Sequence, residues 1–303
     1  MSARPARLGI GVVSAGRVGA VVGAAWAAAG HRVAATSGVS KASVDRAAEL
    51  LPGVPLLAPD AVVAGADLAL LAVPDDVLPG LVRGLAAAGS FRPGQIVVHT
   101  SGAHGVGVLA PATEHGVLPL ALHPVMTFTG RREDVARLAG CCVGVTAAAD
   151  ETADEAAADI GFNVGAALVV EMGAEPVRVA EEVRPLYHAA LAHGANHLVT
   201  LVRDCVQTLE RAGIRPAERL VAPLLSAALD NALRHGDRAL TGPVARGDVG
   251  TVRKHLDELT VVDPELAQTY RALARRTAHR AADAGLLPDH AVDDVLSTLR
   301  EAP

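Results

Sequence analysis

One short segment near the N-terminus constrains the fold more than any other, because it joins an apolar strand to an alanine-rich helix through a glycine-rich turn. The segment reads Leu8-Gly-Ile-Gly-Val-Val-Ser-Ala-Gly-Arg-Val-Gly19. Small residues at Ser14, Gly16 and Gly19 let the backbone turn tightly, approach a ligand and pack the helix against the strand, and free amide groups at the helix N-terminus attract negative charge. Ser14 stands where Gly-x-Gly-x-x-Gly has its first glycine, so we expect a backbone angle there that suits a residue with a Cβ.

This pattern predicts a binding site for a dinucleotide pyrophosphate. Two other interpretations compete with it, since basic residues before an apolar run are typical of a secretory signal and Gly19-x-x-x-Gly23 is typical of a membrane helix. Arg17 argues against both, because an arginine in the middle of such a run costs roughly 3 kcal/mol on membrane insertion. A second predicted strand, residues 31–36, closes a βαβ unit and favours the nucleotide. The residues expected at the pyrophosphate are Ser14, Ala15, Gly16, Arg17 and Val18.

The composition favours a cytoplasmic enzyme. The chain of 303 residues is long enough for two domains that each bury a core. A net charge of -6 and an aromatic content of 2% leave neither a basic surface for a phosphate backbone nor rings on which bases stack. We therefore expect neither nucleic acid nor a membrane as a partner.

The hydrophobic pattern predicts an α/β fold, in which an N-terminal Rossmann parallel sheet is followed by an all-α C-terminal domain. Apolar runs at residues 67–73, 95–99 and 118–122 are typical of buried parallel strands. Crossover segments are expected at 77–88 and 103–115, and two more strands at 142–145 and 176–179 flank an acidic helix from about 150 to 172.

From Pro185 onward the pattern is helical throughout. A helix to about residue 212, a break at 213–216 and a further helical stretch from Pro223 are expected. Asp248 and Asp263 are predicted to cap two later helices. The predicted boundary therefore divides the chain into residues 1–182, which bind the nucleotide, and residues 183–303, which are helical.

The end of the second strand predicts NADP as the cofactor. In NAD-binding domains of this kind an acidic residue there binds the adenosine ribose. The chain reads Thr36-Ser-Gly-Val-Ser-Lys41 instead, with hydroxyl groups and a cation but no carboxylate. We expect Ser37, Ser40 and Lys41 to contact the 2′-phosphate, although an ordinary solvated turn has the same composition.

Polar residues follow three strands at the edge of the sheet where ligands bind in open α/β folds. Val73, Pro74 and Asp75 follow one strand and Thr100 follows the next, and we expect these four at the cofactor, although an aspartate there is more often a helix cap. Ser101 and His123 stand at neighbouring strand ends. They are expected to converge on one substrate oxygen, with which histidine exchanges a proton near neutral pH.

The helical half offers a polar stripe and a cationic loop. His193, Asn196 and His197 share one helix face, which suits a cleft, plain surface or a metal site, and no third metal ligand stands nearby. We expect no metal. Arg246 lies in a glycine-rich loop, where its planar guanidinium suits a carboxylate.

Taken together, these motifs resemble a family of two-domain reductases with a Rossmann-like domain and a C-terminal helical domain of unknown function. The segments that carry the resemblance are 14–19, 73–76, 99–102, 122–124, the helix with His188, His193 and Asn196, and 240–248. The architecture is similar to that of ketopantoate reductase, pyrroline-5-carboxylate reductase and the β-hydroxyacid dehydrogenases. The resemblance implies NADP or NAD as cofactor and a homodimer formed through the helical domain.

The chain departs from some of these relatives in its lysines. β-Hydroxyacid dehydrogenases and ketopantoate reductases place a catalytic lysine on the first long helix after the nucleotide domain, and this chain has no lysine between Lys41 and Lys254. His193 or a neighbour would have to replace it. His123-Pro124 instead resembles a segment of prephenate and arogenate dehydrogenases, in which a histidine and a serine contact the substrate oxygen.

The sequence therefore predicts an NADPH-dependent reductase of a small 2-oxo acid, with 2-dehydropantoate as the leading substrate. His123 or His193 would protonate the forming alkoxide, Ser101 and Asn196 would hold it, and Arg246 would bind the carboxylate. A prephenate-like dehydrogenase and an imine reductase remain as alternatives within the same class. A regulator that senses NADPH without catalysis is the alternative from another class.

Overall fold

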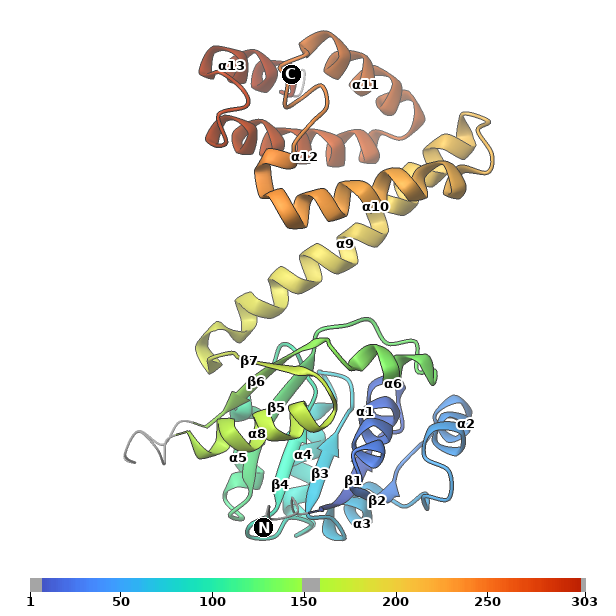
Figure 1. Ribbon diagram of the computed structural model, residues 1–303, viewed down its shortest axis with the longest axis vertical. Coiled ribbons are helices and arrows are strands. Elements are labelled where there is room, and N and C mark those ends of the chain that lie inside the picture. The colour runs from blue at the N-terminus through green and yellow to red at the C-terminus, as the bar shows by residue number, and fades with distance from the viewer. Residues whose placement is uncertain (1–6, 149–158, 301–303) are drawn as a thin grey trace, which may run out of the picture. The chain divides into compact units, whose positions relative to one another are not determined.

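The computed structural model describes residues 7–148 and 159–300, which form two compact units, residues 1–191 and 192–303 (Figure 1). The first unit alternates strands and helices. Its strands are β1 (Gly9–Val13), β2 (Arg32–Thr36), β3 (Leu68–Leu71), β4 (Ile96–His99), β5 (Leu118–Pro124), β6 (Cys142–Ala147) and β7 (Glu175–Arg178). Its helices are α1 (Arg17–Ala28), α2 (Lys41–Leu50), α3 (Pro59–Ala64), α4 (Leu78–Ala87), α5 (Ala110–Thr113), α6 (Glu133–Leu138) and α8 (Ile160–Glu171), with short 3-10 turns η1 (Val106–Leu109) and η2 (Glu181–Val183).

The seven strands form one sheet in the order β2-β1-β3-β4-β5-β6-β7. From β2 to β5 all neighbours are parallel, so their carboxyl ends share one edge. The order reverses at β1, since the chain crosses to β2 on one side and to β3 on the other, and ligands bind at such a reversal in open α/β sheets. The predicted Rossmann sheet is confirmed. The pairing of β5 with β6 is antiparallel, so the last two strands run opposite to the others.

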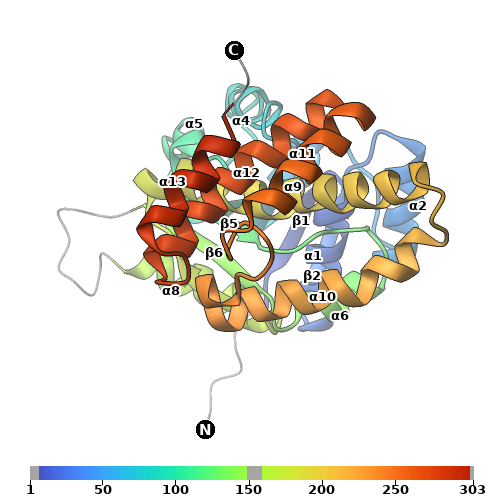
Figure 2. The same cartoon turned by 90° about the horizontal axis from the view of Figure 1, so that it is seen from above.

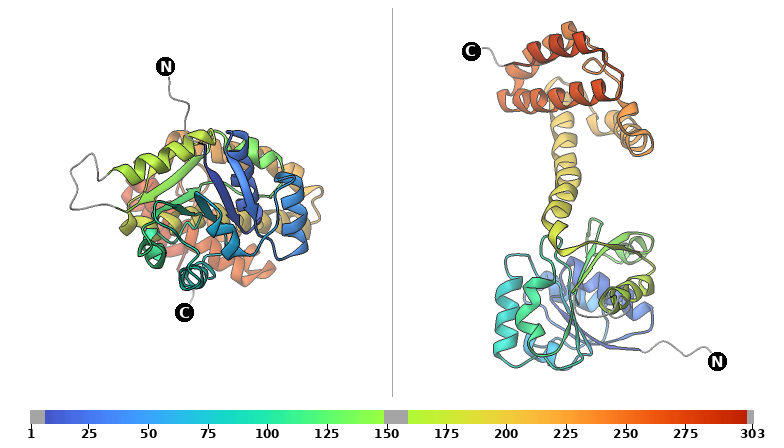
Figure 3. Two further views of the ribbon diagram at one scale, coloured as in Figure 1. Left: turned by 90° about the horizontal axis from the view of Figure 1, so that it is seen from below. Right: turned by 90° about the vertical axis from the view of Figure 1, so that its left-hand side faces the viewer.

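Helices cover both faces of this sheet, which is why its strands are apolar on both sides. One face packs against α1 and α8 around Trp26 and Leu168, and the other packs against α3, α4 and η1 around Leu78 and Leu109. In the right-hand view of Figure 3, α4 and α5 lie on one side of the sheet and α8 on the other.

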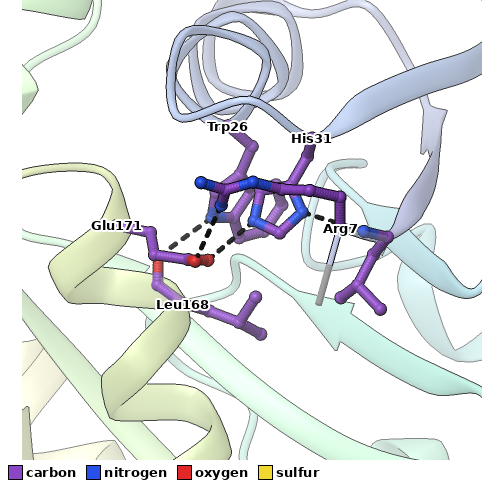
Figure 4. Close-up of polar contacts among 6 residues, drawn as sticks. Arg7, Trp26, His31, Leu168 and Glu171 are labelled. Carbon is purple, nitrogen blue, oxygen red and sulfur yellow. Dashed lines mark hydrogen bonds and ion pairs between the residues drawn. The ribbon is translucent and has the colours of Figure 1, made fainter. Parts of the chain in front are cut away.

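Polar contacts attach α8 to the start of the chain (Figure 4). Glu171 accepts hydrogen bonds from Arg7 Nη1 at 3.1 Å and from His31 Nε2 at 2.6 Å. The His31 Nδ1 atom accepts the amide of Leu8 at 3.1 Å, so the ring proton is on Nε2. These contacts lie at the amino ends of the strands, opposite the edge where the turns carry polar residues.

The second unit is helical. It contains most of α9 (Arg184–Arg211), followed by α10 (Ala217–His235), η3 (Gly236–Ala239), α11 (Val249–Val262), α12 (Pro264–Asp283) and α13 (Asp289–Thr298). The helices α11, α12 and α13 lie side by side in Figures 1 and 2 around a core that includes Val252 and Val295. The caps predicted at Asp248 and Asp263 are present, since Asp248 Oδ1 accepts the amide of Thr251 and Asp263 Oδ1 accepts that of Glu265.

The expected long acidic helix is described only in part. Residues 150–158 lie outside the described residues, and α8 begins at Ile160. The helix α13 was not predicted, although Val295 in it is fully buried. Within the described residues, no helix is both long and apolar enough to cross a membrane.

Candidate functional site

The glycine-rich turn lies between the end of β1 and the start of α1, at the point where the strand order reverses. Ser14 has a φ of 76°, the only positive φ of a non-glycine residue in the part of the chain that is described. The expected angle for Ser14 is therefore wrong: the turn needs the left-handed conformation that costs a residue with a Cβ about 1–2 kcal/mol. Two hydrogen bonds compensate, from Ser14 N to Ser37 Oγ at 2.9 Å and from Ala15 N to the Ser37 carbonyl at 2.7 Å.

The two glycines of the turn have the roles that the sequence predicts. A Cβ at Gly19 would clash with the Ser14 carbonyl and with Ala72, so only glycine lets α1 approach this close. Gly16 is the N-cap of α1 in extended conformation and has no side chain to bond the first amide groups of the helix. Those donors are consequently free for an anion, which is the fit that a pyrophosphate requires.

The structure accounts for the residues that follow β2. Ser37 is buried and Ser40 caps α2, where its Oγ accepts the amide of Ser43 at 3.1 Å. The ammonium of Lys41 bonds Asp45 Oδ2 at 2.6 Å, and both side chains are exposed. Asp45 therefore lies one helical turn beyond Lys41 and pairs with it. The segment from Thr36 to Lys41 alone does not predict this ion pair.

Two arginines lie beside the glycine-rich turn. Arg46 Nη1 donates to the Ala15 carbonyl at 3.1 Å, and a Cβ at Gly130 would meet both Arg46 and Arg17. Arg17 was predicted from the turn. Arg46 was not predicted, because it lies within α2 in a part of the sequence with no motif that points to the turn.

The ends of β3 and β4 differ from expectation in one respect. The alternative interpretation of Asp75 as a helix cap is wrong, since the N-cap of α4 is Val77 and it has no side-chain bond, and the role of Asp75 at the cofactor stays a prediction. Asp75 instead accepts a hydrogen bond at its backbone carbonyl from His104 Nε2 at 3.0 Å. Val73 and Thr100 are half-buried and Pro74 is exposed, all at the edge of the sheet where the glycine-rich turn lies.

His123 and Ser101 lie at neighbouring carboxyl ends, as predicted. Ser101 is buried, and its Oγ accepts the amide of His104 at 2.9 Å. Between the two lies Gly102, where an added Cβ would be 2.9 Å from His123 Nε2 and 2.6 Å from a ring carbon of His188. Burial lowers the pKa of His123 to about 4, and the charges of Arg184 and His188 act in the same direction. His123 is therefore neutral at neutral pH.

The first turn of α9 adds residues that sequence reasoning did not assign. Tyr187 Oη lies 2.8 Å from His123 Nδ1. Arg184 is fully buried and donates to the Ser101 carbonyl at 2.6 Å and to Thr146 Oγ1 at 2.7 Å. The sequence gives only weak indications of these two residues. Tyr187 is one of two tyrosines, and Arg184 directly precedes the proline that predicted the start of the helix.

Arg184 is a buried cation for which the described part of the chain supplies no matching anion. No carboxylate lies within ion-pair distance of it, and its Nε has no hydrogen-bond partner, within residues 7–148 and 159–300. Burial lowers its pKa, whereas Tyr187, Glu181 and Asp75 raise it. An uncompensated charge of this kind favours any negative charge that develops nearby.

Glu181 fixes the start of α9 to the loop after β4. Its carboxylate accepts the amides of Val106 at 2.7 Å and Gly107 at 3.0 Å. A Cβ at Gly105 would collide with this carboxylate, so a larger residue there would displace the Glu181 side chain. The contact holds Arg184 and Tyr187 at the carboxyl edge of the sheet.

The remaining predicted residues belong to the second unit. His193, Asn196 and Arg246 are exposed, and His193 Nδ1 lies 2.8 Å from His197 Nδ1. Among the described residues, no group of three or more His, Cys, Asp or Glu side chains is placed to hold a metal ion. The structure thus brings together His123 and Ser101, and the roles predicted for His193, Asn196 and Arg246 stay predictions.

Comparison with known proteins supports the architecture. Residues 1–124 match a Rossmann-like domain, and residues 146–277 match a domain of unknown function, DUF2520. A protein from Bacteroides fragilis assigned as an NADP oxidoreductase has the same fold, with a TM-score of 0.75 and 19% identity over 90% of this chain and 98% of that one. A pyrroline-5-carboxylate reductase from Coxiella burnetii gives a TM-score of 0.53 and 14% identity over 98% of this chain and 100% of that one.

A type III pantothenate kinase from Anaplasma marginale is also similar in sequence. It is 27% identical over 157 residues, which are 45% of this chain. The chain spans 61% of the length of this curated relative.

Proposed function

Because the chain joins a Rossmann-like domain to a DUF2520 domain, we propose that it is an NADP-dependent oxidoreductase. The observation that carries the proposal is the glycine-rich turn at the reversal of strand order, where α1 begins without a side-chain cap. Its free amide donors suit the pyrophosphate, and Arg17 and Arg46 add positive charge beside it. When bound, NADPH supplies a hydride.

The preference for NADP over NAD rests on the residues after β2. The segment Thr36 to Lys41 contains no acid to bind a ribose hydroxyl, and it offers Lys41 for a 2′-phosphate. Lys41 bonds Asp45 in the structure, so it must leave an exposed ion pair to reach a phosphate. That step costs little, because surface pairs of this kind contribute at most about 1 kcal/mol.

The substrate proposed is a small 2-oxo acid, with 2-dehydropantoate as the leading candidate. His123 lies near the end of β5, and Ser101 follows β4. A carbonyl oxygen bound there would meet the Nε2–H group of His123 and the polar groups around Ser101. A cyclic imino acid is the second candidate, because the fold extends over the whole of a pyrroline-5-carboxylate reductase. On the sequence pattern alone, we propose that Arg246 binds the substrate carboxylate and that Asn196 holds the substrate oxygen.

A screen of NADPH oxidation tests this proposal. The purified protein would be mixed with NADPH and a panel of 2-oxo acids, cyclic imines and prephenate, and the loss of nicotinamide absorbance followed. Turnover with a 2-oxo acid supports the leading candidate, and turnover with an imine alone selects the second. NADPH binding without turnover on any member of the panel would instead identify a sensor.

We also propose a homodimer formed through the second unit. The helix α10 exposes several leucines, among them Leu224 at 67% and Leu233 at 80% exposure. A largely apolar cavity of about 640 Å³ opens in the same unit and is lined by leucines of α9, α11 and α12. Large exposed apolar surface of this kind marks an interface. Analytical ultracentrifugation of the wild type and of the double variant Leu224→Asp/Leu233→Asp tests this proposal. The wild type should sediment as a dimer and the variant as a monomer. A monomeric wild type would refute the dimer.

A further inference from the structure

A tyrosine and a histidine are held together at the edge of the sheet by two elements far apart in the chain. Tyr187 Oη lies 2.8 Å from His123 Nδ1, and the rings meet edge to face with centroids 5.6 Å apart. The tyrosine hydroxyl lies against Gly144, where an added Cβ would be 2.7 Å from it. The absence of a side chain at Gly144 therefore leaves room for the hydroxyl.

The direction of this hydrogen bond decides which nitrogen of His123 faces the site. A phenol hydroxyl is a good donor and Nδ1 of a neutral ring accepts, which leaves the ring proton on Nε2. Nε2 is the atom on the Gly102 side of the ring. The neutral state follows from burial, which lowers the pKa of His123 to about 4.

A neutral histidine cannot complete a reduction alone. If it gave its Nε2 proton to an alkoxide without receiving another, it would be left as an imidazolate anion. A proton that arrives at Nδ1 in the same step avoids this. Tyr187 is the group placed to provide it, since its hydroxyl lies within hydrogen-bond distance of that atom.

Arg184 makes the loss of that proton less costly. Its Cζ lies 5.9 Å from the centroid of the Tyr187 ring, and no described carboxylate pairs with it. Burial raises the pKa of Tyr187 and the charge of Arg184 opposes that rise. A tyrosinate formed during turnover would thus lie beside a buried cation that lacks an anion.

We propose that Tyr187 and His123 form a proton relay, in which His123 gives its Nε2 proton to the substrate oxygen while Tyr187 replaces it at Nδ1. The O–H bond of Tyr187 and the Nε2–H bond break, and an Nδ1–H bond and the alcohol O–H bond form. After the alcohol leaves, water protonates Nε2 and the Nδ1 proton returns to the tyrosinate, which restores the starting tautomer of His123 and releases hydroxide. The relay rests on the proposed reductase function, within which Tyr187 acts through His123 and Arg184 is a positioning residue.

The other titratable groups that face the pair come from four places. His188 is on α9 beside Tyr187, Asp75 follows β3, Cys142 begins β6 and Glu181 precedes Arg184. Any pH dependence assigned to the relay must therefore be compared between variants that leave these four groups unchanged.

The kinetic test uses Tyr187→Phe, which keeps the ring and removes only the hydroxyl. We expect kcat to fall by about 10²-fold with unchanged NADPH affinity, as for loss of proton transfer. Tyr270→Phe is the matched control, since Tyr270 bonds His255 Nδ1 at 3.0 Å in the second unit. It should leave kcat unchanged.

A proton inventory in mixtures of light and heavy water separates a relay from a structural role. The wild type should show a curved dependence of kcat on the deuterium fraction, because two protons move together, and Tyr187→Phe should show a straight line. An active wild type with a straight line, or an unaffected Tyr187→Phe, would overturn the relay and leave the reductase function intact. A wild type that oxidises no NADPH with any substrate would overturn both.

A second readout needs no turnover. The chain has two tyrosines, so Tyr270→Phe makes the near-ultraviolet absorbance of tyrosinate report Tyr187 alone. In that background Arg184→Gln should raise the pKa of Tyr187 and Arg184→Lys, which keeps the charge, should change it less. Equal titration in both variants would show that Arg184 does not act on Tyr187.

Discussion

Each of the two units contains one tyrosine, and each tyrosine is bonded to a histidine Nδ1. Tyr187 meets His123 at 2.8 Å and Tyr270 meets His255 at 3.0 Å, both with rings edge to face. The local geometry of the two pairs is therefore almost the same.

Their surroundings differ. The first pair joins β5 to α9 at the carboxyl edge of the sheet, beside the buried Arg184. The second joins two packed neighbours, α11 and α12, and burial raises the pKa of Tyr270. A hydrogen-bonded tyrosine–histidine pair therefore has no fixed chemistry: its position at the sheet edge, beside an arginine with no ion-pair partner among the described residues, makes the first pair a site for proton transfer.

The largest expected effect is the loss of kcat when the histidine of the first pair is removed. His123→Ala should lower kcat by about 10²–10⁴-fold with little change in NADPH affinity, as expected when a proton donor is removed. His255→Ala is the matched change in the second unit and should leave kcat close to that of the wild type. Equal losses in both variants would erase the distinction between the pairs.

Acid should weaken the first unit next most strongly. The pKa values of His99 and His123 are both lowered from 6.5 to about 4, chiefly by burial. Above pH 6.5 the rings are neutral in the folded and unfolded chain. As the pH falls from 6.5 toward 4 the unfolded chain binds protons that the folded chain does not, so each histidine should remove about 3 kcal/mol from the free energy of unfolding across that window.

Urea unfolding near pH 7 and about pH 5 measures this loss. His99→Gln should reduce the difference between the free energies of unfolding measured at the two pH values. The same change at the exposed His290 serves as the control and should leave it intact. An acid response that His99→Gln does not alter would contradict the assignment to buried neutral rings.

A smaller effect tests whether the second unit contributes to substrate binding. If Arg246 pairs its guanidinium with a substrate carboxylate, Arg246→Lys should raise KM, and Arg246→Ala should lower kcat/KM by about 2 kcal/mol. NADPH affinity should stay the same. A weaker affinity for NADPH with normal substrate kinetics would move Arg246 to the cofactor, and no change in either would confine recognition to the first unit.

The smallest effect concerns the cofactor. Lys41→Gln should weaken NADPH about tenfold and leave NADH nearly unchanged, since it removes one charged contact to the 2′-phosphate. Asp45→Asn is the companion change, because it frees Lys41 from its 2.6 Å pair and should not weaken NADPH. Fluorescence titration of both cofactors measures these constants, and a wild type that prefers NADH would refute the assignment of NADP.

Much of this site could be predicted from local sequence. The apolar runs predicted β3, β4 and β5, and because parallel strands share a carboxyl edge, Ser101 and His123 could be placed near each other without coordinates. The conformation of Ser14 could not. Because Ser14 has a Cβ, the sequence predicted an ordinary negative φ, whereas the hydrogen bond to Ser37 holds the residue at a φ of 76°.

The sequence by itself determined the Rossmann sheet, the glycine-rich turn and the strand ends that carry polar residues, because periodicity and turn chemistry act over a few residues. Only the tertiary structure decided that Tyr187 meets a histidine 64 residues away and that Arg184 is buried beside them with no carboxylate of the described residues within ion-pair distance. The reason is physical. A hydrogen bond between distant segments and the desolvation of a charge depend on how β5, β6 and the start of α9 pack, and no local pattern encodes that packing.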